Sequence, residues 1–555
     1  MRLLPRILPT EEEEDLRLDE PEPAPAPKAA PAARVSPWLV SGAVALIAAI
    51  PRLLYLFVFT DPENPGLGAY NDVWHHWQIA YLTKEIGLSA PGGPRLWDLK
   101  GLDYFWGVLH PLLMVAVFDV TGSIDIVLNR LVSMVFGIAV VVLLFHICRR
   151  YWGTHVALGS ALVASLLPTS VMNDTSGMLE PLGVALCLYG IWAWGRQRGF
   201  WSGLAFGLAT MARAEAWLFS LGLVIAAFLR RQDWRQRGPL VAGFAAVMLL
   251  YMKVLLDQTG NAVYPLWWNF FANAVGKWES TPVTASQAGV RPFLGIALVV
   301  ALVGLGLALW KRPPSYMLLT FGFGYWVFVA GMLGFTSYLA SWVWWMPITR
   351  VFAFPYVFAG VLVVIALFAW AGRRAGRMAA PLGWTAVVGM LLVSQLSWIP
   401  IAQVFGPTEN EWHATLAASR QLGAWYNTPP YQGHSLAVPP DRPDVTYGLA
   451  RFGGVEGKHL VSEMYDPFAY LPAGYKYDEH PDAVNTLLEC WLYKTDTRLM
   501  AMPSDNANYA LMREYNPAWF AQLGTMDNTG WLIYGVSAPN PTRTTCEEAA
   551  RATSL

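Results

Sequence analysis

The stretch WLVSGAVALIAAIPRLLYLFVF, residues 38–59, decides the class of fold to which this chain belongs. Its only charged residue is Arg52, and the other side chains are almost all apolar or small. A helix that crosses a hydrocarbon core of ~30 Å needs ~20 residues of this kind. We therefore predict that residues 38–59 form a membrane-spanning helix.

Similar apolar runs recur along the chain. Of its 555 residues, 55% are hydrophobic and only 14% are charged, which is too apolar for an aqueous globular protein. The sequence predicts eleven spans, and besides the first these are 126–147, 155–171, 181–194, 199–212, 214–229, 238–256, 293–310, 316–335, 351–371 and 380–399. A shorter run, residues 112–117, predicts an interfacial helix. The predicted fold class is mainly α, a polytopic membrane protein.

Composition divides the chain into three parts. Residues 1–36 combine an acidic run with a Pro/Ala run, and they predict a disordered tail because they have too little apolar surface to fold. Residues 37–402 contain all the predicted spans and form the expected membrane domain. Residues 403–555 are polar and, at ~150 residues, have the size of one domain. There we expect an amphipathic helix near 414–425 that leads into a small α/β domain.

Basic residues predict the orientation of the chain, because Lys and Arg concentrate in cytoplasmic loops. They crowd five short loops, such as Arg230–Arg237, which we place in the cytoplasm with the N-terminus. The longer loops and residues 403–555 then lie outside the cytoplasm, as expected for a multi-pass protein of the cytoplasmic membrane. Six charged residues from distant parts of the sequence fall on this outer face: Asp72, Asp174, Glu180, Arg213, Glu215 and Arg350.

The outer segment Tyr70-Asn71-Asp72-Val73-Trp74-His75-His76-Trp77 contains the first candidate for chemistry. Asp72 can act as a general base if partial burial raises its pKa from the ordinary ~3.9. The alternative is that Asp72 only caps a helix that starts at Val73, since Asp is a preferred N-cap residue. His75 is a candidate metal ligand, although adjacent histidines on a helix point in different directions.

The acidic residues Asp174 and Glu180 fall in a predicted outer loop, residues 172–180. Carboxylates that converge at a bilayer edge often serve function, so both are candidate site residues. The alternative for Glu180 is structural, because Glu180-Pro181 is also a typical start of a helix.

Two arginines at the outer face are candidate phosphate ligands. Arg350 follows an aromatic-rich loop, and a guanidinium matches the geometry of phosphate oxygens. Its alternative is snorkelling toward lipid headgroups. Arg213 can likewise bind a phosphate or form a structural ion pair with Glu215, two residues further along the chain.

Several classes of protein are excluded or unsupported. A formal net charge of -1 argues against nucleic acid as a partner. No GxGxxG, Walker, GxSxG or HExxH motif occurs, so no nucleotide cofactor is expected. Four cysteines without a CxxC pair suggest neither a zinc knuckle nor a dense disulfide scaffold. Cys490 and Cys546 can pair if their domain is extracytoplasmic, or both can be free thiols.

A series of short motifs occurs in order along residues 38–400. They are Pro51-Arg52-Leu53, Asp72, Leu109-His110-Pro111-Leu112, Asn129-Arg130-Leu131, Arg149-Arg150-Tyr151-Trp152-Gly153, Met178-Leu179-Glu180-Pro181-Leu182, Gly203-Leu204-Ala205-Phe206-Gly207-Leu208-Ala209 and the segment from Arg350 to Pro355. In this order and spacing the chain resembles the GT-C class of polyprenyl-phosphate-sugar-dependent membrane glycosyltransferases. Within it, the chain is most similar to family 39 protein mannosyltransferases and the aminoarabinose-transferase-like group.

The resemblance implies an activity and assigns roles to residues. It implies an inverting hexosyltransferase-like enzyme that moves a sugar from a polyprenyl-phosphate donor to an extracytoplasmic protein, lipid or glycan acceptor. Asp72 maps onto the catalytic base and Arg350 onto the arginine that binds the lipid phosphate. Asp174 and Glu180 map onto acidic residues that hold a metal or orient the acceptor in some members. Besides these, we expect Arg213 and His110 to contact the substrate and its phosphate, and His75 to join Asp174 and Glu180 if a divalent metal, Mn or Mg, is bound.

Some features depart from the family pattern and leave other functions open. Pro111 is followed by Leu112 instead of a second proline, and Asn71-Asp72 stands where an acidic pair is usual. Oligosaccharyltransferases share the architecture, but their WWDYG motif is absent from residues 403–555. A transporter or flippase for lipid-linked sugars is an alternative, although its charges would be spread through the helices. A non-catalytic scaffold is another.

Overall fold

Apolar helices make up most of the chain between residues 37 and 405. The computed structural model describes residues 36–65, 72–86, 106–230, 233–267, 289–338, 350–405, 408–438, 442–462, 481–504, 510, 513–526, 530–540, 542 and 545–546. The chain divides into two units, Met1–Ala43 and Val44–Leu555. The first unit includes the start of helix α1, and every contact discussed below lies within the second.

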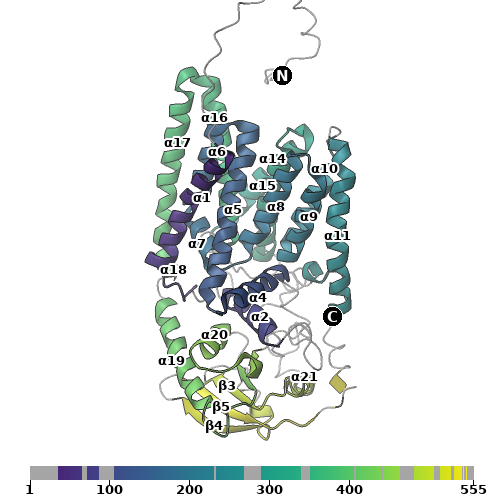
Figure 1. Ribbon diagram of the computed structural model, residues 1–555, viewed down its shortest axis with the longest axis vertical. Coiled ribbons are helices and arrows are strands. Elements are labelled where there is room, and N and C mark those ends of the chain that lie inside the picture. Colours follow the sequence, from purple (N-terminus) through teal and green to yellow (C-terminus); the bar gives the residue numbers. More distant parts are fainter. Residues whose placement is uncertain are drawn as a thin grey trace, which may run out of the picture. The chain divides into compact units, whose positions relative to one another are not determined.

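The long helices follow the predicted pattern (Figure 1). They are α1 (Pro37–Leu54, continued by the π-helical turn η2, Tyr55–Phe59), α5 (Ile126–Trp152), α6 (Thr154–Leu166), α8 (Glu180–Gly195), α9 (Gly199–Ala212), α10 (Glu215–Ala227), α11 (Trp234–Thr259), α14 (Arg291–Lys311), α15 (Tyr316–Tyr338), α16 (Ala353–Arg374) and α17 (Ala379–Ser394). Each of the eleven predicted ranges overlaps one of these helices, so the predicted fold class is confirmed.

Not all of these helices have the length of a complete span. Among the described residues, seven are long and apolar enough to cross a membrane, and one bent pair raises the number to eight. Helices α9 and α10 are apolar but shorter. The chain is therefore an integral membrane protein in which some apolar helices do not cross the whole hydrocarbon layer alone.

The predicted span over 155–171 is broken into two helices by a bend. Helix α6 ends at Leu166, and a separate helix α7, Pro168–Ser176, continues at an angle of 61°. The residue before a proline avoids the helical region, and Leu167 has the extended backbone angles φ -63° and ψ 123°. Pro168 then occupies the first turn of α7, where a missing N–H costs nothing. The bend also moves Asp174 out of the predicted loop and into α7.

Short helices lie between the long helices and the C-terminal strands (Figure 1). Helix α2, Asp72–Ile86, is almost entirely buried in spite of its many polar side chains. Helix α4, Leu109–Thr121, contains the predicted interfacial run 112–117 and packs against α2.

The C-terminal part forms the predicted α/β structure. Its five strands are β1 (Leu436–Val438), β2 (Leu460–Ser462), β3 (Leu499–Pro503), β4 (Phe520–Met526) and β5 (Trp531–Val536). They form one mixed sheet in the order β2-β1-β3-β5-β4, in which β1 is parallel to β2 and β3, while β5 is antiparallel to β3 and β4. The accompanying helices are α19 (Thr408–Tyr426), α20 (Pro443–Arg451) and α21 (Pro481–Lys494).

One hydrophobic core joins the sequence before residue 402 to the sequence after it. A single cluster of buried side chains contains Val73 and Trp77 of α2, Tyr447 of α20, and Leu436 and Ile533 of the sheet. The predicted boundary at 402/403 therefore marks a change in composition, but a common core crosses it. A second, smaller cluster lies between the five strands and α21 and belongs to the C-terminal part alone.

Candidate functional site

Asp72 is the first residue of α2, and its side chain is half-buried. A carboxylate in the first turn of a helix is stabilised by the helix dipole, so the capping alternative is compatible with this position. The next residue, Val73, packs against the turn between α7 and α8. A Cβ atom on Gly177 of that turn would lie 2.9 Å from Val73 Cγ1, and Gly177 has a φ of +93°. A glycine is therefore needed where α2 begins.

Arg130 fixes the segment that leads toward α2. Its guanidinium is buried and donates to backbone and side-chain oxygens of three elements. The acceptors are Thr175 O at 2.7 Å, Asp61 O at 2.7 Å, Pro62 O at 2.9 Å, Asn64 O at 3.2 Å and Thr60 Oγ1 at 3.2 Å. Arg130 thus joins the start of α5, the end of α7 and the segment that follows η2.

Asp174 forms a buried ion pair with Arg52 of α1. The Arg52 Nη2 to Asp174 Oδ2 distance is 2.5 Å, and Arg52 Nε donates to the same oxygen at 3.0 Å. The side chains are 0% and 1% exposed. A cation inside an apolar helix requires such a partner, and Asp174 therefore neutralises Arg52.

Glu180 and Glu215 share one arginine. Arg213 Nη1 lies 2.9 Å from Glu180 Oε1, and its Nε contacts Glu215 Oε1. Glu180 also begins α8 with Pro181 behind it, as the structural alternative predicted. Two carboxylates around one guanidinium leave a net negative charge, which repels phosphate. This arrangement favours the ion-pair alternative for Arg213 over phosphate binding.

Three histidines and a tryptophan meet beside α2. The ring of His76 lies 4.7 Å from that of Trp106 and 6.0 Å from that of His110, and His75 lies 5.7 Å from Trp106. Gly107, with a φ of +110°, packs so closely on the end of α9 that a Cβ there would lie 2.9 Å from Ala212 C. Gly107 follows Trp106 of the histidine cluster, and Ala212 precedes Arg213. This contact therefore packs the segment of the histidine cluster against the segment that contains Arg213.

Burial keeps two of these histidines neutral. It lowers the pKa of His110 to about 4, and neither of its ring nitrogens has a hydrogen-bond partner among the described residues. Burial also lowers the pKa of His75, and the nearby charge of Asp72 partly opposes this effect. His110 is therefore a neutral imidazole, which can donate one hydrogen bond but supplies no charge.

Arg350 begins the short helix η5, Arg350–Phe352, which packs against α7. Its side chain, like Tyr70 and Asn71 of the motif around Asp72, lies outside the described residues. The backbone of Arg350 thus lies next to the helix that contains Asp174, and α7 leads into the turn on which Val73 rests. Two segments that are distant in the sequence, α7 and η5, therefore pack together. The convergence of Asp72, Asp174 and Arg350 in one site stays a prediction.

The predicted metal set is not assembled. Across the part of the chain that the structure describes, no three His, Cys, Asp or Glu side chains form a group that could hold a metal ion. Asp174 and Glu180 each form an ion pair with a different arginine, and His75 lies in the aromatic cluster. The described side chains do not fit a divalent metal.

Sequence reasoning missed the partners of Arg52 and Arg130. Both arginines lie in apolar stretches, where a charged side chain must find a partner inside the protein. That signal was present, but it does not say which carboxylate or carbonyl groups are the partners. The fold and these polar contacts together define an integral membrane protein whose buried charges gather where short helices meet the long ones.

Comparison with known proteins places this architecture in a class. Residues 107–256 match the family model of the dolichyl-phosphate-mannose-protein mannosyltransferases. Among curated proteins, none has a sequence that matches this chain.

Solved structures share the fold over almost the whole chain. ArnT from Cupriavidus metallidurans in the apo state has a TM-score of 0.51 at 14% identity, covering 91% of this chain and 100% of ArnT. ArnT bound to undecaprenyl phosphate has a TM-score of 0.50 at 13% identity, with coverage of 90% and 100%. The Archaeoglobus fulgidus oligosaccharyltransferase in complex with zinc and sulfate has a TM-score of 0.50 at 12% identity, with coverage of 90% and 73%. The chain therefore has the fold of the GT-C membrane glycosyltransferases, and the predicted resemblance is confirmed.

Proposed function

We propose that this protein is an inverting glycosyltransferase that moves a sugar from a polyprenyl-phosphate donor to an acceptor hydroxyl on a protein, lipid or glycan. The observation that supports this most is the position of Asp72. It begins a buried helix, the residue after it, Val73, rests on the α7–α8 turn, and its charge acts on the nearby His75. A half-buried carboxylate at such a place can accept a proton while bulk water is largely excluded.

The reaction then needs one proton transfer and one displacement at carbon. Asp72 removes the proton of the acceptor hydroxyl, and the acceptor oxygen attacks the anomeric carbon. The bond from that carbon to the phosphate oxygen breaks, and polyprenyl phosphate leaves with the electron pair. Attack from the face opposite the phosphate inverts the anomeric configuration.

The leaving phosphate needs a positive group, and we assign this role to Arg350. Arg213 is a weaker candidate because Glu180 and Glu215 already neutralise it. Arg350 belongs to the short helix η5, which packs against α7. The complex of ArnT with undecaprenyl phosphate supports a lipid phosphate as the donor carrier.

We further propose that the site and residues 403–555 face the extracytoplasmic side. Cys490 and Cys546 form a disulfide with a Cα–Cα distance of 5.5 Å, whereas the buried Cys148 and Cys187 are free. Disulfides persist in oxidising compartments, so this pair supports the orientation that the basic loops predict. Thiol labelling of intact cells before and after reduction tests this placement.

The test of the activity is release of radiolabelled sugar from a polyprenyl-phosphate donor by the purified full-length chain. Asp72→Asn should lower the rate by about 10²- to 10⁴-fold, the usual contribution of a general base. Asp257→Asn, at an exposed aspartate paired with Lys253, is the matched control and should keep wild-type activity. Equal turnover of wild type and Asp72→Asn would remove the mechanism, and movement of intact donor without cleavage would favour the transporter alternative.

A further inference from the structure

Helix α2 is covered by aromatic side chains of the C-terminal part. The ring of Trp74 stacks on Trp412 of α19 at 4.9 Å and lies 5.0 Å from Tyr447 of α20. The ring of Trp77 meets Tyr447 edge-on at 4.8 Å. All four rings are fully buried. A helix of this length is marginal in isolation and depends on such packing.

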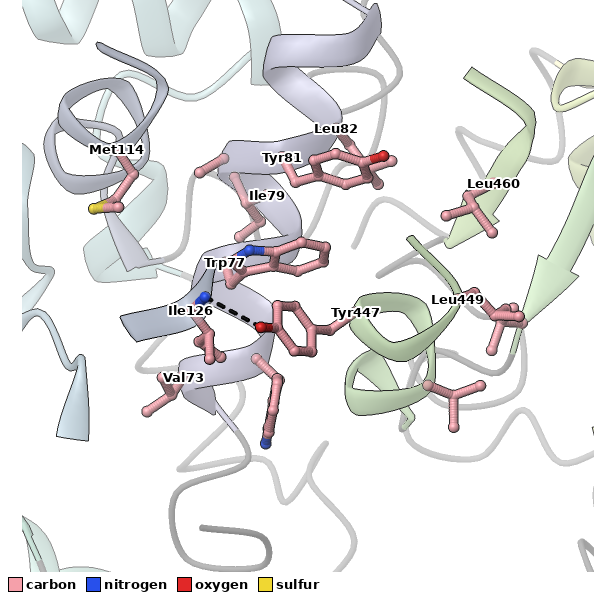
Figure 2. Close-up of a cluster of buried hydrophobic side chains, with 14 of the residues drawn as sticks. Val73, Trp77, Ile79, Tyr81, Leu82, Met114, Ile126, Tyr447, Leu449 and Leu460 are labelled. Atoms are coloured by element: carbon pink, nitrogen blue, oxygen red, sulfur yellow. Dashed lines mark hydrogen bonds between the residues drawn. The ribbon is translucent and has the colours of Figure 1, made fainter. Parts of the chain in front are cut away.

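The hydroxyl group of Tyr447 reaches the beginning of α5. The backbone N–H of Ile126 donates to it at 3.4 Å, and the hydroxyl donates to Asp125 Oδ1 at 3.5 Å. Asp125 is the N-cap of α5 and accepts from Val127 N at 2.9 Å. Burial raises the pKa of Tyr447, so the phenol stays protonated and remains a donor. Figure 2 shows the ring of Tyr447 next to Trp77 of α2, with its hydroxyl group directed at Ile126 of α5.

Further contacts join the same three elements. Trp77 Nε1 donates to Ile124 O at 2.6 Å, just before α5. Gln78 Nε2 donates to Thr446 Oγ1 at 3.4 Å, next to Tyr447. One face of α2 is therefore attached both to α20 and to the start of α5. Tyr447 of α20 contacts both α2, through the rings of Trp74 and Trp77, and the start of α5, through its hydroxyl group.

We propose that Tyr447 is a positioning residue: it holds α2 against the start of α5 and so fixes the carboxylate of Asp72. This inference rests on the proposed function, since it assigns Asp72 the catalytic role. Tyr447 itself lies on the C-terminal side of the composition boundary. The C-terminal part thus takes part in catalysis by orienting α2, in addition to any contact with an acceptor.

The test compares Tyr447→Ala, which removes the ring, with Tyr447→Phe, which removes only the hydroxyl. Tyr493→Ala, at an exposed tyrosine of α21, is the matched control. Hydrogen exchange is measured by mass spectrometry over residues 72–86, and over residues 131–150 of α5 as a report on global folding. The kcat and KM for the lipid-linked donor are measured on the same full-length preparations.

Tyr447→Ala should raise exchange of residues 72–86 by about tenfold or more while exchange of residues 131–150 stays at the wild-type rate. Its kcat should fall by about 10²-fold with KM for the donor little changed, as expected when a reacting group is misplaced. Tyr447→Phe should recover most of both losses, and the control should match wild type.

Wild-type exchange of residues 72–86 in a folded Tyr447→Ala protein would overturn the proposal, as would a rise in KM without a fall in kcat. If Tyr447→Ala does not fold, Tyr447→Phe decides, because α2 must then still exchange measurably faster than in wild type. Asp72→Asn separates the two proposals. If Asp72→Asn remains active, the proposed function fails. The hydrogen exchange of residues 72–86 in the Tyr447 variants still tests whether Tyr447 holds α2.

Discussion

Arg52 and Asp174 lie 122 residues apart in the sequence, yet their side chains form a 2.5 Å ion pair with almost no exposure. The guanidinium of Arg52 also donates to Ala48 O, Ser165 O, Ala164 O and Ser170 Oγ. The pair therefore joins α1 to the bend between α6 and α7, and it neutralises a cation that would otherwise be buried without a counter-charge.

Removing one partner of this pair should destabilise the protein strongly. Arg52→Leu or Asp174→Leu leaves a buried charge without a partner, which costs about 3–5 kcal/mol. The double variant removes both charges and should recover part of the loss. Thermal unfolding in detergent measures the effect, and two single variants with wild-type melting temperatures would contradict it.

Arg130→Lys should weaken the segment before α2 although the charge is kept. A lysine has three donors on a single nitrogen and cannot reach the five oxygens that the Arg130 fork contacts. We expect a loss of about 1–3 kcal/mol in stability, from carbonyl groups left without donors. Arg377→Lys, at an exposed arginine, is the matched control for thermal unfolding. An equal effect of both substitutions would show that the fork geometry does not matter.

His110 should make the protein less stable in acid. Its folded pKa of about 4 lies below the ordinary 6.5, so the unfolded chain binds a proton at a higher pH than the folded one. The resulting loss in the free energy of unfolding is absent above pH 6.5, grows as the pH falls toward 4, and reaches roughly 3 kcal/mol.

Replacing His110 tests this dependence directly. His110→Asn should flatten the decrease in melting temperature between pH 6.5 and pH 4, because an amide does not titrate in this range. His413→Asn, at an exposed histidine, should leave the decrease unchanged. If the melting temperature of wild type and of His110→Asn fell in parallel with pH, His110 would not be the cause of the loss of stability in acid.

Arg350 and Arg213 should respond differently to loss of charge. Arg350→Gln should raise the KM for the lipid-linked donor about tenfold or more and leave the melting temperature unchanged, as expected for a phosphate ligand. Arg213→Gln should lower the melting temperature, since Glu180 and Glu215 would lose their shared cation. The reverse pattern would assign the phosphate contact to Arg213.

Much of the fold followed from local properties of the sequence. Apolar run length predicts helices that suit a bilayer, and each predicted range overlaps a helix because lipid forces every span to satisfy its own backbone hydrogen bonds. The bend within 155–171 also has a local cause in the sequence. Leu167 precedes Pro168, and a residue before proline disfavours the helical backbone conformation.

Which charges meet was decided only by the tertiary structure. The sequence presents Asp174 and Glu180 as similar carboxylates near one loop, but helix packing pairs one with Arg52 and the other with Arg213. The same holds for Tyr447, whose contact with α2 spans hundreds of residues of chain. Run length and hydropathy act over one helix, whereas charge pairing and aromatic stacking depend on distances that exist only after the helices have packed.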